Sequence, residues 1–198
     1  MKKSFYWLLL IPVLLLAGGW TWRYISFNQY YEGISDSTQV VYSIGESIQF
    51  GEDYIDYKLT ADGYSIRIDD FVIVNADKLS DMVEIDTTQL ESVPDRIALV
   101  SITVMNEGST AVGVPLTELE LYGVDEWLFA EYELLDLMNP VLEGNSGISL
   151  ADGTSYQVVL PYGLYENRFS NYSWNHMDHY ELFLQVTTHP TRKIVKLQ

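Results

Sequence analysis

The feature that most constrains this fold is the run Arg96–Met105, RIALVSITVM, which gives an extended segment no polar face. The run is rich in β-branched residues, which favour strands, and successive side chains of a strand point to opposite faces. A strand that is apolar on both faces must be covered on both sides. Because Asn106-Glu107-Gly108-Ser109 then has the composition of a turn, the run predicts a central strand of a layered β domain.

Shorter apolar runs broken by turn residues lie on both sides of this central strand. The clearest alternates Tyr64, Ile66 and Ile68 with polar neighbours, which is the pattern of a half-buried strand. Many short strands separated by turns predict an all-β fold, a sandwich or a barrel. The other predicted strands are Ser47–Phe50, Tyr54–Leu59, Phe71–Val74 after a bulge near Asp70, the run that begins at Pro115, Ser155–Leu160, Tyr180–Val186 and Ile194–Leu197.

Residues 125–138 leave helix and strand both open. Their Glu, Leu and Ala content favours a helix, and Asn139-Pro140 would end it. We expect a strand around Trp127–Ala130 and one short helix around Glu131–Met138 within this connection.

The first 27 residues differ in kind from the rest. Phe5–Trp22 carries no charge, and as a helix it would span about 27 Å, close to the thickness of a bilayer core. Lys2 and Lys3 precede it, which predicts that the N-terminus stays in the cytoplasm and the bulk crosses the membrane. A cleaved signal peptide is the alternative, because Ala17 and Gly19 form a plausible cleavage pair.

These patterns predict three parts: a signal peptide or transmembrane anchor at 1–27, a short polar stalk at 28–39, and an acidic β-sandwich ectodomain at 40–198. Residues 5–22 are the expected membrane contact. The prediction is therefore a single-pass cell-membrane protein with an extracellular C-terminal domain, or a secreted protein if the leader is cleaved.

Charge and cysteine content exclude several classes of protein. The net charge is −17 and all 28 carboxylates lie beyond the apolar segment, so the domain repels phosphate backbones and nucleic acid is excluded as a partner. The chain has no cysteine, which rules out a disulfide framework, a thiol nucleophile and a zinc–thiolate site. An exported domain held by its core alone favours a bacterial source.

Three clusters invite a catalytic or metal interpretation, and none has the required pattern. His176 and His179 lie at the start of a predicted strand, where positions three apart face opposite sides. The Gly144–Gly147 segment lacks the strand–turn–helix pattern of a serine nucleophile. An acidic connection lacks the spacing of a Ca²⁺ loop, which leaves weak Ca²⁺ binding as an alternative; its carboxylates are Asp69, Asp70, Asp77, Asp81, Glu84 and Asp86. We expect no catalytic residue, no metal site, no cofactor and no enzymatic activity.

The segment between residues 162 and 180 is the best candidate for ligand binding. Its aromatic rings lie beside amide and guanidinium groups, a combination that proteins use to bind sugars and peptides. Packing of the same rings against the end of the domain is the alternative. The candidate ligand-binding residues are Tyr162, Tyr165, Arg168, Tyr172 and Trp174.

An ordered series of turns and strands runs through roughly Ile48 to Leu197: Asn106-Glu107-Gly108-Ser109-Thr110, Leu119-Glu120-Leu121-Tyr122, Leu150-Ala151-Asp152-Gly153 and Gln157-Val158-Val159-Leu160-Pro161-Tyr162. This series resembles the immunoglobulin-like "telokin-like" domains of unknown function in exported Gram-positive surface proteins. The resemblance implies an immunoglobulin-like β-sandwich at the cell surface and supplies no catalytic residues. The chain departs from the lipid-anchored members because it lacks their anchoring cysteine.

Taken together, the sequence predicts a membrane-anchored, non-enzymatic extracytoplasmic domain that binds an extracellular protein or glycan. The alternative is a structural accessory subunit of a cell-envelope assembly. A Ca²⁺-binding or carbohydrate-binding module is a further alternative.

Overall fold

The computed structural model describes residues 16–24, 38–79, 92–109, 111–124 and 126–198. The chain divides into two compact units, Met1–Ser37 and Thr38–Gln198. In the first unit, residues 16–24 are helical, and Trp20 and Trp22 expose 69% and 74% of their surface. Across the described ranges, no helix is long and apolar enough to cross a membrane. The anchor predicted at residues 5–22 lies mostly outside those ranges.

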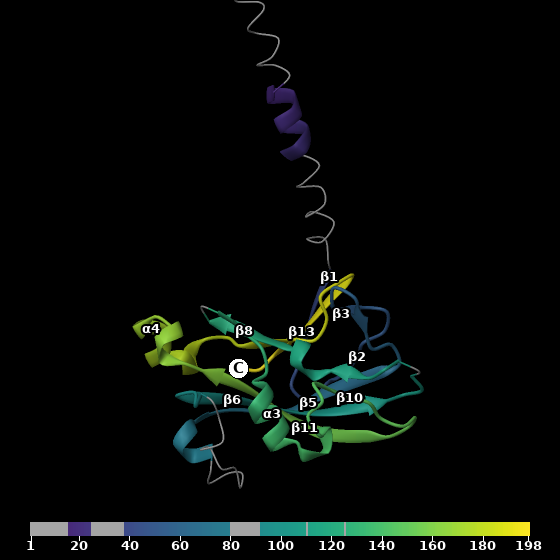
Figure 1. The fold of residues 1–198 in the computed structure, drawn as a ribbon, viewed down its shortest axis with the longest axis vertical. Helices are drawn as coiled ribbons and strands as arrows, with labels where there is room; N and C mark the ends of the chain where they lie inside the picture. The colour runs from purple at the N-terminus through teal and green to yellow at the C-terminus, as the bar shows by residue number, and fades with distance from the viewer. Residues whose placement is uncertain (1–15, 25–37, 80–91, 110, 125) are drawn as a thin grey trace, which may run out of the picture. The chain divides into compact units, whose positions relative to one another are not determined.

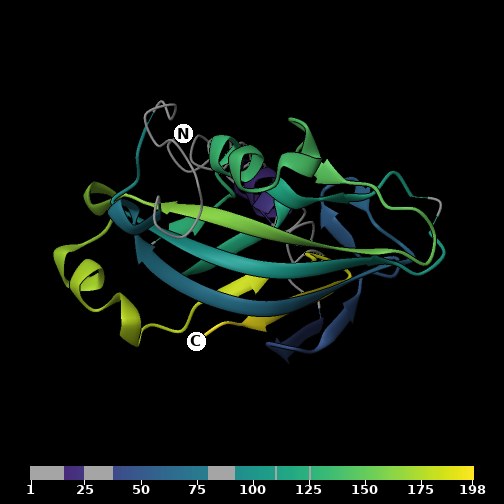
Figure 2. The ribbon, with the colours of Figure 1, turned by 90° about the horizontal axis from the view of Figure 1, so that it is seen from below.

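The second unit is built from two main sheets that share one core (Figure 1; Figure 2). Strand β1 runs parallel to β13, and the other neighbours within these sheets are antiparallel. One sheet has the order β1 (Thr38–Ser43), β13 (Thr191–Lys196), β12 (Phe183–Gln185), β8 (Glu120–Val124), β9 (Glu126–Leu128). The other has the order β11 (Ser155–Leu164), β6 (Arg96–Asn106), β5 (Tyr64–Asn75), β2 (Ser47–Gln49).

Short elements complete this unit at its ends and edges. Two strand pairs stand apart from the main sheets: β3 (Tyr54–Asp56) with β4 (Leu59–Thr60), and β7 (Val114–Pro115) with β10 (Gly147–Ile148). The helices are α3 (Tyr132–Met138) and α4 (Asn171–Asn175). The 3-10 turns are η1 (Ala76–Lys78), η3 (Leu116–Glu118), η4 (Pro140–Leu142), η5 (Glu166–Arg168) and η6 (Met177–His179).

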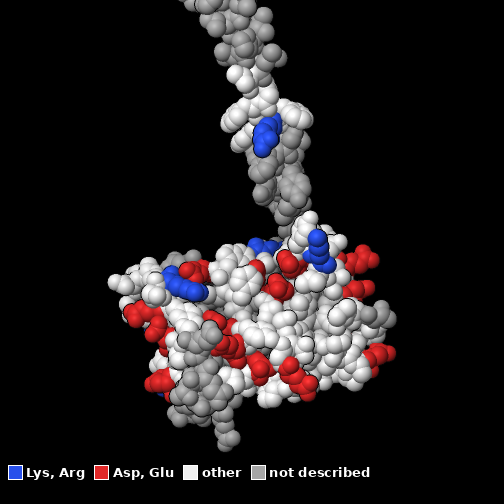
Figure 3. Space-filling view, viewed as in Figure 1, with Lys and Arg blue, Asp and Glu red and all other residues white. Residues whose placement is uncertain are grey.

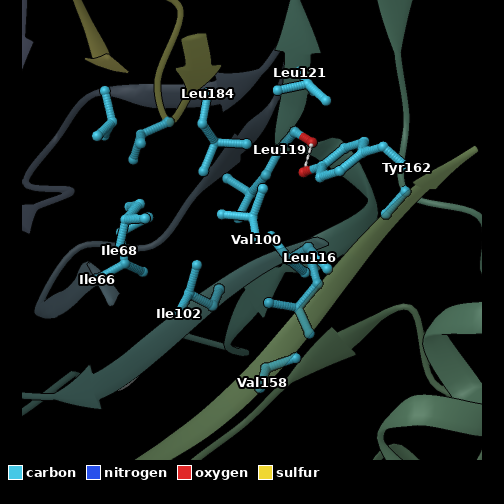
Figure 4. Close-up of a cluster of buried hydrophobic side chains, with 14 of the residues drawn as sticks. Ile66, Ile68, Val100, Ile102, Leu116, Leu119, Leu121, Val158, Tyr162 and Leu184 are labelled. Atoms are coloured by element: carbon cyan, nitrogen blue, oxygen red, sulfur yellow. Dashed lines mark hydrogen bonds between the residues drawn. The ribbon is translucent and has the colours of Figure 1, made fainter. Parts of the chain in front are cut away.

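Strand β6 is covered on both faces, as its sequence predicts. Val100 and Ile102 point into the core between the two sheets (Figure 4). Ile97 and Leu99 point the other way and pack under Leu134 of α3. The all-β prediction is therefore confirmed. One face of β6 contributes to the core between the two sheets, and its other face packs against α3.

Several predicted boundaries shift, each for a local reason. The bulge is confirmed, since the pairing of β5 with β6 is irregular between Ile68 and Asp70. The helix expected at 131–138 is confirmed as α3. Strand β11 extends to Leu164 because β6 pairs with it as far as Arg96. The strand expected at 180–186 shortens to β12, since Tyr180 caps η6 and the pairing with β8 begins only at Phe183.

An ion pair ties β13 to the turn that follows β2. The Lys193 ammonium lies 2.7 Å from a carboxylate oxygen of Asp53 and donates to the main-chain carbonyls of Gln49 and Phe50. The other Asp53 oxygen accepts the Thr191 N–H at 2.9 Å. Burial acts to raise the pKa of Asp53, but these bonds and the Lys193 charge outweigh it and hold the pKa below its ordinary value.

Candidate functional site

The residues predicted to bind a ligand do not form one surface. Tyr162 belongs to β11 and is fully buried, and its hydroxyl donates to the Leu119 carbonyl at 2.7 Å (Figure 4). Trp174 is buried as well, with the Arg96 guanidinium 4.3 Å from its ring centroid. Both rings therefore serve packing. Strand β11 and helix α4 turn them inward, which is the packing alternative for this segment.

The other three predicted residues lie at the surface but are dispersed. Tyr165 is half-buried, with its hydroxyl 3.3 Å from a Glu131 carboxylate oxygen and the Arg168 guanidinium 4.9 Å from its ring. Tyr172 exposes 67% of its surface and stacks on His176 at 4.3 Å. None of these contacts joins Tyr172 to the other two.

The histidines considered as metal ligands lie in other elements than the sequence predicts, and Asp69 is held by protein contacts. His176 caps α4 and His179 ends η6, so the expectation that they begin a strand is wrong; their rings lie 6.2 Å apart. Asp69 is engaged by Arg67 at 2.6 Å and by the Thr103 hydroxyl at 2.5 Å. Among the described residues no group of three or more His, Asp or Glu could hold a metal ion. The candidates Asp81, Glu84 and Asp86 lie outside the described residues.

A row of three stacked aromatic rings crosses the five-stranded sheet on the face turned away from the core. The register pairs Phe183 of β12 with Tyr122 of β8, and Tyr122 with Trp127 of β9. The ring centroids are 5.5 Å apart for Phe183 and Tyr122 and 4.5 Å apart for Tyr122 and Trp127, with interplanar angles of 23° and 15°. Cross-strand aromatic pairs stabilise such sheets, and we call these three residues the aromatic row.

A chain of polar side chains runs beside the aromatic row. Arg192 of β13 places its guanidinium carbon 4.9 Å from the Tyr122 ring and 5.5 Å from the Trp127 ring. Its Nε donates to Gln185 at 2.7 Å, and the Gln185 amide donates to Glu120 at 2.9 Å. Its Nη2 is buried and has no hydrogen-bond partner among the described groups, so the two rings supply its cation–π contact.

This arrangement leaves the indole at the edge of the sheet accessible. Trp127 is 51% exposed although Tyr122 covers one of its faces, whereas Tyr122 and Phe183 are half-buried. Burial, together with the charges of Glu118 and Asp56, raises the pKa of the neighbouring Glu120 carboxyl, and Arg192 acts against the rise. The site therefore combines one exposed aromatic plate with donors and acceptors whose positions are fixed by the sheet.

Gly123 explains how the aromatic row is held together. Its φ is +136°, and a Cβ at this position would lie 2.1 Å from the Glu181 carbonyl oxygen. Only glycine lets β8 pass so close to the chain that leads into β12. The irregular pairing of β8 with β9 falls at the same place, between Tyr122 and Val124. This contact brings Phe183 and Tyr122 together.

Sequence reasoning missed the aromatic row although its signal was present. The alternation of Leu119 and Leu121 with polar neighbours assigns Tyr122 to the outer face of its strand. The alternation that buries Leu182 and Leu184 likewise places Phe183 outside. The pairing of the strands was not available from the sequence, so the three rings could not be brought together.

Comparison with known proteins gives a family but no activity. Residues 39–193 match the model of a family described as a domain of unknown function, DUF5028. The chain belongs to this family. The match contains the whole aromatic row and Arg192, so these groups lie within the DUF5028 domain itself. No curated protein matches the chain.

Among solved structures, the chain is similar to that of the yjhA protein from Bacillus subtilis, with 13% sequence identity and a TM-score of 0.42. The alignment covers 79% of this chain and 99% of that one. This likeness is too weak to transfer a fold or a function.

Proposed function

We propose that this DUF5028 domain is a non-enzymatic binding module and that the aromatic row, with Arg192, Gln185 and Glu120 beside it, binds a neutral saccharide. The observation that carries the proposal is Trp127, which is 51% exposed yet held in place by its stack on Tyr122.

The chemistry of the surface fits a sugar. An indole offers a flat apolar plate for the C–H face of a pyranose ring, and large rigid rings provide contact area at low conformational cost. Sugar hydroxyls can donate to a carboxylate, and the half-buried Glu120 supplies that acceptor, while the buried Gln185 amide holds it in position. Because Tyr122 and Phe183 already order Trp127, little freedom is lost on binding.

The charge of the chain favours a neutral ligand. The chain has a net charge of −17 and repels polyanionic glycans at long range, and Arg192 is already engaged by Gln185 and two rings. Neutral hydroxyls therefore suit the site better than sulfate or carboxylate groups.

The proposal includes the setting of the domain. It is an extracytoplasmic, immunoglobulin-like β-sandwich tethered by residues 5–22. The two sheets around one core support the sandwich, and the exposed rings of Trp20, Trp22 and Tyr24 on helix 16–24 support an interfacial anchor.

The test is binding of the full-length chain to an array of neutral oligosaccharides, followed by titration calorimetry with the best ligand. Replacing Trp127 with alanine removes the plate, and we expect a loss of about 2 kcal/mol, or roughly 30-fold in affinity. Tyr57→Ala is the control, since Tyr57 is an exposed ring outside both the aromatic row and the segment 162–180.

Two outcomes contradict the proposal. If no saccharide binds, the accessory-subunit alternative is favoured. If a saccharide binds equally well to the Trp127→Ala variant, its site lies elsewhere. Unfolding curves of both variants show whether the fold is kept, since both rings are surface residues.

A further inference from the structure

An apolar groove lies at the other side of the domain, between the β3–β4 hairpin and the β7–β10 pair. Its volume is about 840 Å³, within the range typical of small-molecule sites. Exposed apolar side chains form its rim and buried ones its floor. The rim includes Leu59, Val112, Val141 and Tyr156, and the floor includes Val114 and Ile148.

The groove is held open by backbone contacts and by one buried side chain. A Cβ on Gly113 would lie 2.3 Å from the Ile148 carbonyl oxygen, so the chain entering β7 and strand β10 touch through main chain within one wall of the groove. The Asn106 amide donates to the Leu150 carbonyl at 2.8 Å and accepts the N–H groups of Gly108 and Ser109. These bonds fix both loops that flank the groove in the absence of a ligand.

The charge of the groove contrasts with that of the chain. Lys58 is the one charged side chain among its described lining residues, although the chain carries 28 carboxylates and 11 lysines and arginines. No described carboxylate forms an ion pair with Lys58, whose ammonium lies 5.2 Å from the Tyr57 ring. The surface over β10 is largely uncharged (Figure 3). An apolar groove in which Lys58 is the one charged residue of the described lining complements an apolar ligand with one anionic end.

We propose that this groove binds a single-chain amphiphile with an anionic head, namely a fatty acid. The aliphatic tail lies along the rim residues Leu59, Val112 and Val141, and the carboxylate meets Lys58. Burial of each additional methylene strengthens binding by up to about 4-fold, which sets a dependence on chain length. The site is separate from the aromatic row and does not depend on saccharide binding.

The test is photolabelling of the full-length chain, reconstituted in lipid nanodiscs, with a dodecanoate that carries a diazirine near the end of its tail. We expect mass spectrometry to find the label on the segments that line the groove. Unlabelled dodecanoate should suppress the labelling, whereas dodecyltrimethylammonium at the same concentration should not, because its head is repelled by Lys58.

Matched variants localise the effect. Val141→Asp places a carboxylate in the apolar rim and should reduce groove labelling at least 10-fold, while Val93→Asp, equally exposed but outside the groove, should leave it unchanged. Lys58→Gln should reduce the labelling of the groove about 5-fold, and Lys78→Gln should leave it unchanged. Trp127→Ala should leave the labelling intact. Labelling confined to other segments, insensitive to Val141→Asp, or suppressed equally by the cationic amphiphile overturns the proposal.

Discussion

The aromatic row and the apolar groove are both exposed surfaces of one domain, but they are built differently. The aromatic row lies on three adjacent strands, and the sheet register sets the spacing of its rings. The groove lies between turns and two-residue strands, and its shape depends on main-chain contacts at Gly113 and on the bonds of Asn106. A sheet surface is rigid because its backbone is paired along its length, whereas a groove between turns depends on a few local contacts.

This difference implies that the two surfaces respond separately to mutation. A change in a turn should alter the groove and spare the aromatic row, and a change that separates β8 from β12 should do the reverse. The first two predictions test this separation directly.

The largest expected effect follows Asn106→Ala. Asn106 is 3% exposed, and its removal takes the partner from the N–H groups of Gly108 and Ser109 and leaves the Leu150 carbonyl with the longer bond from the Tyr64 hydroxyl, at 3.3 Å. We expect a loss of about 3 kcal/mol in the free energy of unfolding, measured with urea, because each buried polar group left unpaired costs about 1–3 kcal/mol.

The same variant should lose the groove ligand and keep the near-ultraviolet circular dichroism of the stacked rings. The exposed Asn175→Ala variant, which removes one bond to the Asn171 carbonyl, is the control and should change stability by less than about 0.5 kcal/mol. Equal losses for the two variants would show that Asn106 does not organise the turns.

The next effect is that of Gly123→Ala, which should damage the aromatic row. The new methyl group collides with the Glu181 carbonyl and occupies a backbone conformation that favours glycine. We expect a cost of about 2–3 kcal/mol and a weaker near-ultraviolet signal, since Phe183 moves away from Tyr122.

Gly45→Ala separates these two causes. Gly45 has a φ of +90°, but a Cβ there meets nothing within 4 Å. The Gly45→Ala variant should lose about 1 kcal/mol in the free energy of unfolding through the backbone conformation alone. Its near-ultraviolet circular dichroism from the stacked rings should not change. A ring signal that survives Gly123→Ala would mean that this close approach does not set the row.

The sequence predicts the layers of this fold better than it predicts the surfaces. Alternation identifies which side of β6 or β8 is buried, because burial of apolar groups acts on each strand separately. The all-β class, the bulge near Asp70 and helix α3 are recovered for that reason.

The candidate site required information that a single strand does not carry. Tyr122 and Trp127 meet through the local pairing of β8 with β9, but Phe183 joins them only through the pairing of β12 with β8, which is non-local. Composition drew attention instead to the segment that holds Tyr162 and Trp174, whose rings fill the core. A high density of aromatic residues signals burial as readily as binding.

A third prediction concerns the support that the two surfaces share. Asp53→Asn removes a carboxylate whose side chain is 11% exposed and leaves the Lys193 ammonium without its counter-charge, so we expect a loss of about 2 kcal/mol at pH 7. The pKa of Asp53 is lowered by folding, so this contribution is complete above the unfolded value of 3.8 and fades as the pH falls through the folded value.

The unfolding free energies of wild type and Asp53→Asn should therefore begin to converge below pH 3.8 and meet below the folded pKa of Asp53. Lys196→Gln, which breaks the exposed pair with Glu181, is the control and should cost less than about 0.5 kcal/mol. Because Lys193 bridges the sheets, Asp53→Asn should weaken both surfaces alike, and a selective loss of one would contradict the shared support.

The smallest expected effect is a gain in stability, and it arises at the aromatic row alone. The pKa of Glu120 is raised by burial and by Glu118 and Asp56, which means that the charged carboxylate destabilises the folded state once it ionises. Glu120→Gln removes that charge, and the new side-chain carbonyl can still accept the Gln185 amide.

The sign follows from linkage. Below the unfolded pKa of 4.5, Glu120 is protonated in both states and the variant should match the wild type; toward pH 7 the variant should become more stable, by less than about 1 kcal/mol because Glu120 is partly exposed. Urea unfolding at pH 4 and pH 7 measures the difference. A variant less stable than the wild type at pH 7 would mean that Arg192 requires the Glu120 charge, and that the polar chain beside the rings is held by charge rather than by the geometry of the sheet.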